Sequence, residues 1–196
     1  MTEEDLTPKD VRMLQALDAN AENLAPYGQI LGPQAGATLT PSPFYGPAVA
    51  TSHPVDFRSD ATTELTLCRL QPRPLEVQFM ERHFLHTQTF IPLGGKPFVA
   101  VMAPPSDGGL PDLDAVRAFR FDGTAGFTMH LGTWHEFPFA ERDDTDLIVV
   151  LRRETMRDLG ADRMTHSKRF GDEAFGPDLD KKNLVARTGA MFRVGR

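Results

Sequence analysis

The sequence predicts a mainly β fold, arranged as an antiparallel sandwich or a closed barrel. Short runs of alternating or continuous apolar residues follow one another between residues 64 and 151, and no run between them has the period of a helix. Turn signals such as Gly94-Gly95 and Asp122-Gly123 separate these runs. The expected strands are 64–70, 77–85, 88–93, 98–103, 115–121, 127–131, 134–139 and 147–151. Many short strands without intervening helices favour a sandwich or barrel over a parallel α/β sheet.

The first 22 residues are expected to form an N-terminal arm. Thr7 can cap a helix that begins at Pro8, and Val11, Leu14 and Leu17 recur on one helical face. The sequence therefore predicts a short amphipathic helix that packs on the barrel or on a neighbouring subunit. A turn at residues 25–28 then leads into a candidate strand. Residues 32–47 are rich in Gly and Pro and are expected to be irregular.

The C-terminal part differs in character. Residues 154–163 are expected to form a short helix, and residues 160–196 a C-terminal extension with few apolar residues. This extension is expected to return as an edge strand or to cover a dimer surface. We expect one domain over residues 1–196, with a core at about 24–152.

Composition narrows the class of partner. The 196 residues are 40% hydrophobic with a net charge of −6, and acidic and basic residues are mixed along the chain. This argues against a nucleic-acid groove or an anionic membrane surface as the main partner and favours a small molecule. Cys68 is the single cysteine, the start has no secretory pattern, and no apolar run approaches the ~20 residues of a membrane span. We expect a cytoplasmic protein.

Residues 81–95 concentrate the chemistry. Carboxylate, guanidinium, imidazole and amide groups alternate there with apolar residues, and such groups require water, partners or a ligand when buried. Strand alternation places Glu81, His83 and Leu85 on one face and Arg82, Phe84 and His86 on the other. We therefore expect His83 and Gln88 to face into the barrel, so that Arg82 faces out.

A second candidate group is at residues 129–136. His130 and His135 lie on either side of Gly132, and Trp134 offers an apolar wall. Two adjacent imidazoles can bind a metal or share proton transfer, although a structural role is equally common for any one histidine. The remaining histidines, His53, His86 and His166, are expected to be structural.

Arg117 lies in a strand-like run between apolar residues. Such an arginine suits fork-like recognition of a carboxylate, with a cross-strand salt bridge as the equal alternative. The sequence has no Gly-rich phosphate loop, CxxC, HExxH or GxSxG motif, which argues against nucleotide cofactors and serine-hydrolase chemistry.

The ordered set of these motifs resembles the ureidoglycolate lyase family. The resembling segments are residues 25–28, 81–83, 87–88, 90–93, 98–101, 117–119, 134–135 and Pro138. The resemblance implies a cupin-type double-stranded β-helix (a jelly-roll barrel), usually a homodimer. It also implies an enzyme of allantoin and purine catabolism that cleaves (S)-ureidoglycolate to glyoxylate and urea. Glu136 replaces the second histidine of the family's Trp-His-His-Pro motif, and the tail beyond about residue 159 is longer than expected.

The chemistry of this reaction suggests roles for individual residues. His83, His130 and His135 are candidates for proton transfer, and Arg82 or Arg117 for holding the substrate carboxylate. Gln88 and Trp134 are further candidates for binding the substrate. His83, Gln88 and His135 occupy the places of cupin metal ligands, which implies a weakly held or dispensable nickel, manganese or zinc ion. Two alternatives stay open: a cupin enzyme for another small hydroxy or amino acid, and a non-catalytic module that binds small carboxylates.

Overall fold

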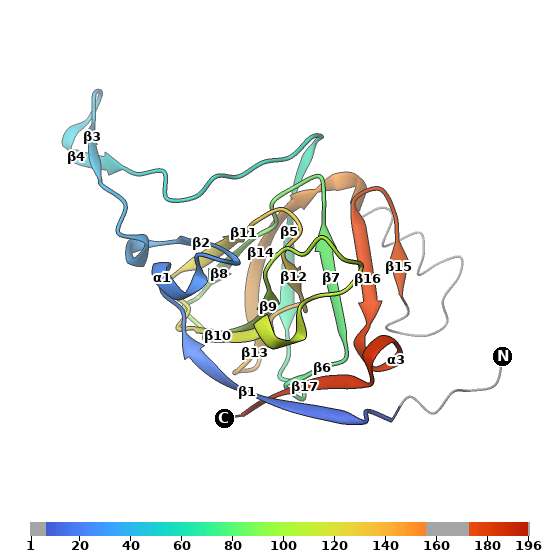
Figure 1. Cartoon of the computed structure of the whole chain (residues 1–196). Helices are drawn as coiled ribbons and strands as arrows, with labels where there is room; N and C mark the ends of the chain where they lie inside the picture. The colour runs from blue at the N-terminus through green and yellow to red at the C-terminus, as the bar shows by residue number, and fades with distance from the viewer. Residues whose placement is uncertain (1–6, 156–172, 196) are drawn as a thin grey trace.

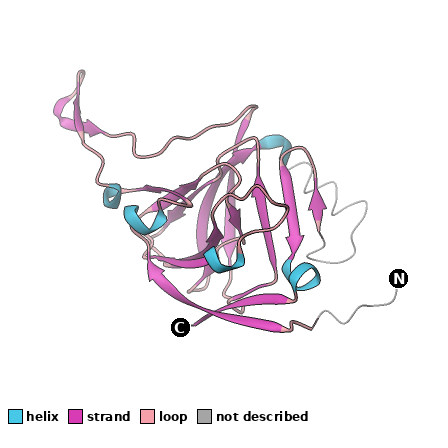
Figure 2. Cartoon of the chain, in the orientation of Figure 1, coloured by secondary structure: helices cyan, strands magenta, loops and turns pink. Residues whose placement is uncertain are grey.

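Two curled β-sheets face each other and enclose the main hydrophobic core (Figures 1 and 2). The structure is a computed structural model that describes residues 7–155 and 173–195. The predicted mainly β, barrel-like fold is confirmed. Among the described residues, no helix is long and apolar enough to cross a membrane.

The larger sheet contains the first and the last strands of the described residues. Its strand order is β15 (Ala174–Phe175), β16 (Leu179–Asn183), β7 (Phe79–His83), β12 (Trp134–His135), β9 (Phe98–Ala103), β10 (Arg117–Phe121), β1 (Asp10–Asp18), β17 (Ala190–Gly195) and β6 (Glu76–Val77), and β13 (Phe139–Ala140) also pairs with β9. Most of its pairs are antiparallel, but β1 is parallel to both β10 and β17.

The smaller sheet closes the opposite side of the barrel. Its order is β2 (Gly28–Leu31), β11 (Gly126–Met129), β8 (Thr89–Leu93), β14 (Thr145–Arg152) and β5 (Thr63–Leu70). A separate hairpin of β3 (Thr40–Ser42) and β4 (Gly46–Thr51) projects away from the body of the molecule (Figure 1). The helical segments that lie wholly within the described residues are short: α1 (Ala21–Leu24), η1 (Pro33–Ala35), η2 (Leu113–Ala115) and α3 (Leu184–Thr188).

Two apolar clusters lie on opposite faces of the larger sheet. The interior cluster contains a stack of aromatic rings from both sheets, in which Phe121 lies 4.8 Å from both Phe98 and Phe127. The outer cluster includes Met80, Val101 and Trp134 and is covered in part by α3 and β17. Because side chains alternate along a strand, the face of each site residue can be assigned from the cluster that its neighbours join.

The predicted N-terminal helix is wrong, because these residues form strand β1. The apolar residues Val11 and Leu17 are exposed, and the partly buried residues are Arg12, Leu14 and Ala16, at a period of two. The backbone of β1 is paired with β17 and with β10. These long-range pairings outweigh a weak local preference for helix.

Other sequence-based expectations agree better with the structure. The single strand predicted at 134–139 is divided into β12 and β13, and Pro138, which cannot donate to a ladder, lies between them. The expected irregular segment 32–47 contains η1, β3 and the start of β4. The C-terminal extension does return to the sheet, as β15, β16 and β17. Most of the helix expected at 154–163 lies outside the described residues.

Candidate functional site

Strands β7 and β12 bring three ionisable side chains to the interior face of the larger sheet. His135 pairs with Glu81 on one side and with Met102 on the other, and Met102 belongs to the interior cluster. Residues directly opposite each other in a ladder share a face, so His135 and Glu81 also point inward. His83 follows Glu81 by two residues in β7 and therefore joins them. The predicted inward orientation of His83 agrees with this geometry.

The three side chains are close enough to act together. Oε1 of Glu81 lies 3.6 Å from Nε2 of His135 and 3.9 Å from Nε2 of His83, and the two imidazole rings are 5.4 Å apart at their centroids. His83 and His135 are buried, while the Glu81 side chain is 17% exposed. Glu81 is thus the member of this group nearest to solvent.

Both imidazoles are neutral at pH 7. Burial lowers the pKa of His135 to about 4, and burial together with repulsion from His135 and His86 holds the pKa of His83 well below 6.5. Nδ1 of His135 donates to the Thr133 carbonyl at 3.1 Å, so its proton is fixed on Nδ1 and Nε2 has a lone pair. His135 therefore presents a hydrogen-bond acceptor or metal ligand to the site.

His86 and Asp178 adjoin this group. The His86 ring lies 4.6 Å from that of His83, and its Nδ1 is 2.9 Å from Oδ2 of Asp178. Strand β7 ends at His83, and the bend at residues 84–85 breaks the alternation that was expected to turn His86 outward. His86, which was expected to be structural, is hydrogen-bonded to Asp178, and it also lies beside His83.

Gln88 enters from the smaller sheet. It precedes β8, it is 6% exposed, and it lies two residues before Phe90 of the interior cluster. Its Oε1 is buried and has no hydrogen-bond partner among the described residues. The inward orientation predicted for Gln88 agrees with this position.

The residues present fit a divalent metal ion. Within the described ranges, the buried ring nitrogens without a hydrogen-bond partner are Nδ1 and Nε2 of His83, Nε2 of His86 and Nε2 of His135. Neutral imidazole nitrogens and a carboxylate are the donors that nickel, manganese and zinc accept. Ligand atoms of Glu81, His83 and His135 lie within 4.8 Å of one another, and so do those of His83, His86 and Asp178. This fits the tentative assignment of His83 and His135 as ligands and adds Glu81.

Arg82 and Trp134 lie on the other face of the sheet. Trp134 is fully buried in the outer cluster, and the Arg82 guanidinium stacks 4.3 Å from its ring. Arg82 also donates to Asp180 at 3.1 and 3.2 Å and to the Ser106 carbonyl at 2.7 Å. We therefore remove both residues from the candidate substrate-binding set and assign them to packing of the outer face.

Arg117 is on the same face as the histidines, at an exposed position. It pairs with Met102, which pairs with His135, so a single cross-strand row joins the three residues. Its guanidinium donates to the carbonyls of Asp114 and Val116. The same row continues through Glu81 to Lys181 of β16, which sequence reasoning did not identify.

His130 is separate from both histidine groups. Its Nε2 is 3.0 Å from the Ala25 carbonyl, and its backbone N–H donates to the carbonyl of Tyr27. The residue thus joins the turn before β12 to the turn before β2. The structure gives His130 a structural environment in place of the predicted catalytic one.

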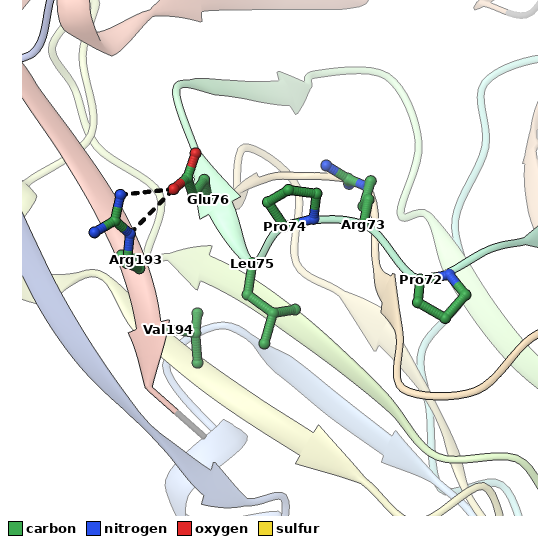
Figure 3. A pocket seen from close by; sticks show the side chains of 7 residues that line it. All are labelled: Pro72, Arg73, Pro74, Leu75, Glu76, Arg193 and Val194. Atoms are coloured by element: carbon green, nitrogen blue, oxygen red, sulfur yellow. Dashed lines mark hydrogen bonds and ion pairs between the residues drawn. The ribbon is translucent and has the colours of Figure 1, made fainter.

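A pocket on another part of the molecule holds none of the predicted site residues. It is lined by residues 72–76 with Arg193 and Val194 (Figure 3). Its cations already have partners: Arg193 binds Glu76 at 2.7 Å, and Arg73 binds Glu136 at 2.9 Å. Burial raises the pKa of Glu136, although Arg73 opposes this shift. Glu136 therefore faces Arg73, although it directly follows His135 in the sequence.

Asp178 is the site residue that sequence reasoning missed most completely. It lies in the extension that was expected to be an edge strand or a dimer cover, and no local motif marks it. The only available signal is the pairing of β16 with β7, in which Leu179 is opposite His83. That pairing is a long-range contact, which the periodicity of one sequence cannot reveal.

Comparison with known proteins identifies the relationship. The ureidoglycolate lyase family matches residues 11–169 of the chain. A ureidoglycolate lyase of Azotobacter vinelandii is 38% identical over 104 residues, covering 53% of this chain and 60% of that protein. One of Pseudomonas putida F1 is 40% identical over 110 residues, covering 53% and 59%, and one of Burkholderia mallei is 37% identical over 112 residues, covering 56% and 64%. The chain thus spans about 60% of the length of these relatives.

Similarity to solved structures is more distant. The 3,4-ketoisomerase QdtA of Thermoanaerobacterium thermosaccharolyticum covers 70% of this chain and 96% of its own, at 11% identity and a TM-score of 0.35. A likeness at this level carries no argument about function. The family match covers most of the chain and includes every site residue predicted from the sequence, from Arg82 to His135. The chain belongs to the ureidoglycolate lyase family.

Proposed function

We propose that the protein is a ureidoglycolate lyase that cleaves (S)-ureidoglycolate to glyoxylate and urea. The observation that carries this proposal is the convergence of Glu81, His83 and His135 on the interior face of the barrel in a chain of this family. The proposal includes a cytoplasmic homodimer that acts in allantoin degradation.

The reaction requires little more than positioned proton transfer. A base removes the hydroxyl proton of ureidoglycolate, the oxygen's electron pair forms the aldehyde of glyoxylate, and the carbon–nitrogen bond breaks. Its electrons go to the ureido nitrogen, which takes a proton and leaves as urea. Such acid–base steps typically contribute ~100- to 10,000-fold each.

The chain offers suitable groups for these steps. The carboxylate of Glu81 has a second oxygen besides Oε1, and this oxygen can take the hydroxyl proton. The lone pair on Nε2 of His135, 3.6 Å from Oε1 of Glu81, then stays available to hold a metal ion. His83 is the second neutral imidazole and can hold the departing ureido nitrogen by a hydrogen bond.

A divalent ion would be held by His83, His135 and Glu81, with Gln88 as a neutral oxygen donor from the other sheet. When bound, such an ion would polarise the oxygen atoms of the substrate as a Lewis acid. Because glutamine is uncharged, we propose that the ion is nickel, manganese or zinc and is weakly held.

Metal removal is expected to lower activity reversibly. Dialysis against a chelator should reduce turnover at least ~10-fold, because it removes the charge that holds the four donor side chains together. Nickel, manganese or zinc should restore it, with metal content measured by mass spectrometry. Full turnover of protein shown to hold no metal would contradict the metal assignment.

Arg117 is proposed to bind the substrate carboxylate. Arg117 lies on the same cross-strand row as His135, two strands away. Their backbones are therefore about 10 Å apart, and the long side chain of Arg117 can span part of this distance. Arg117→Gln should raise KM roughly 10-fold with kcat within about 3-fold, because a charge-assisted hydrogen bond is worth about 1.5–3 kcal/mol.

Two variants test this assignment. Arg120→Gln changes an arginine on the opposite face of β10 that is already bound to Glu141, and it should leave KM unchanged. Lys181→Gln removes the cation at the other end of the row. If Lys181→Gln raises KM and Arg117→Gln does not, Lys181 binds the carboxylate and the Arg117 assignment is wrong.

The direct test of function is turnover of (S)-ureidoglycolate by the purified chain. Urea and glyoxylate should appear in equal amounts, and the (R) enantiomer should react much more slowly. A panel of other small hydroxy and ureido acids provides the comparison. Folded, metal-loaded protein that releases neither product at millimolar substrate would exclude the proposed activity.

A further inference from the structure

We propose that Asp178, from the C-terminal extension, is a positioning residue that holds His86 so that its Nε2 accepts a hydrogen bond from the substrate. The identity of the substrate in this statement rests on the proposed function. The orientation of His86 rests only on contacts within the chain.

Asp178 is held by donors on both carboxylate oxygens. Oδ1 accepts from the backbone N–H groups of Phe84 at 3.1 Å and Leu85 at 2.7 Å, at the bend that follows β7. Oδ2 accepts from Nδ1 of His86 at 2.9 Å and from the hydroxyl of Thr155. The side chain is 2% exposed. A buried carboxylate with four donors has one orientation, so it can fix the ring that it binds.

The contact with Asp178 also fixes the His86 tautomer. An ionised carboxylate only accepts hydrogen bonds, so the proton of the His86 ring is on Nδ1. Nε2 then has a lone pair. This nitrogen is buried and, within residues 7–155 and 173–195, has no hydrogen-bond partner.

The His86 ring lies next to the candidate site. The His86 ring is 4.6 Å from that of His83, which itself lies beside Glu81 and His135. A buried acceptor without a partner is satisfied by a ligand that brings a donor. Ureidoglycolate has a hydroxyl and ureido N–H groups, and each of these is a donor.

The register of the sheet places Asp178 at this point. Leu179 of β16 is opposite His83 of β7, so the residue before β16 meets the bend after β7. Asp178 lies beyond residue 169, where the family match ends. The extension thus contributes to the site as well as to the edge of the sheet.

The tautomer can be measured directly. Long-range proton–nitrogen correlation spectra of the full chain should show His86 protonated at Nδ1 and not at Nε2, with its signals assigned by their loss in His86→Gln. In Asp178→Asn, the amide keeps an oxygen for the Phe84 and Leu85 N–H groups but presents an N–H to His86. The proton of His86 should then move to Nε2.

The kinetic measurement uses a matched control. Asp178→Asn should lower kcat/KM for ureidoglycolate about 10- to 100-fold, the usual effect of removing a carboxylate that orients a site histidine. Asp180→Asn changes the next carboxylate along the chain, which binds Arg82 on the opposite face. It should change neither the His86 tautomer nor kcat/KM of the folded protein.

Three outcomes would overturn the proposal. The proposal is wrong if the spectra show that His86 of the wild-type protein is protonated at Nε2, and this result does not depend on whether Asp178→Asn folds. An unchanged kcat/KM would also overturn it, if the Asp178→Asn variant is folded and its His86 proton has moved to Nε2. The proposal would also be wrong if Asp178→Asn loses its bound metal while KM stays unchanged, because His86 would then bind the ion and not the substrate. The tautomer measurement needs no turnover, so it separates failure of this proposal from failure of the proposed function.

Discussion

Replacing His83 by leucine is expected to lower kcat/KM at least ~100-fold while leaving the metal-free protein as stable as wild type or more stable. His83 is 4% exposed, its pKa is held well below 6.5 by burial, and neither ring nitrogen has a hydrogen-bond partner among the described residues. A buried polar group without partners costs about 1–3 kcal/mol, which an apolar side chain of similar size removes. If His83 were present for folding alone, His83→Leu would instead lower the stability of the metal-free protein.

His86→Leu is the matched control for this prediction. Here the same substitution removes a donor from the buried Asp178 carboxylate, so the free energy of unfolding should fall by about 1–3 kcal/mol. In a chain of this size, each kcal/mol lowers Tm by about 2–4 °C. Thermal unfolding of both variants in a chelator gives the comparison. If His83→Leu is destabilised as much as His86→Leu, His83 has a structural role.

The stability measurement must be made without metal. A bound ion stabilises the folded state by an amount that grows with its concentration, and His83→Leu would lose that contribution together with a proposed ligand. With nickel or zinc present, wild type should therefore unfold at a higher temperature than His83→Leu. A functional histidine therefore predicts that His83→Leu is at least as stable as wild type without metal and less stable than wild type with metal. A structural histidine predicts that His83→Leu is the less stable protein in both conditions.

The part of the site that could be predicted from sequence is the part that lies in regular strands. Alternation in β7 correctly separates His83 from Arg82, because the strand is regular from Phe79 to His83. The same rule fails for His86, three residues later, because the Asp178 carboxylate binds the backbone at Phe84 and Leu85 and forms a bend there. No pattern within residues 81–95 records a partner so far along the chain.

Long-range pairing also explains why the helix predicted at the N-terminus is wrong. Thr7, Pro8 and a spacing of three between apolar residues satisfy the local signals of a helix. Strand β1 forms instead because the edges of β10 and β17 are available to pair with it. Most of the strands expected between residues 64 and 151 were predictable because their pattern and their turns agree, although the strand expected at 77–85 is divided into β6 and β7.

Arg82→Met is expected to lower the free energy of unfolding by about 3 kcal/mol, while the KM measured for the folded protein changes less than about 3-fold. The substitution leaves Asp180, 2% exposed, without its guanidinium partner, and it removes the cation stacked on Trp134. The loss should be at the lower end of the range for buried pairs, because Nζ of Lys182 lies 2.8 Å from the other oxygen of Asp180. Denaturant unfolding gives the free energy, and steady-state kinetics gives KM.

Arg69→Met provides the comparison for an arginine at the surface. Arg69 binds Asp146 through two hydrogen bonds, but its side chain is 60% exposed, so its loss should cost less than about 1 kcal/mol. The contrast tests the reassignment of Arg82, because the resemblance to the family made it a candidate for holding the substrate carboxylate. If folded Arg82→Met binds substrate ~10-fold more weakly, as the loss of a charge-assisted hydrogen bond would produce, the residue returns to the substrate site. That result would also require the strand alternation of β7 to break before His83, contrary to its pairing with β16.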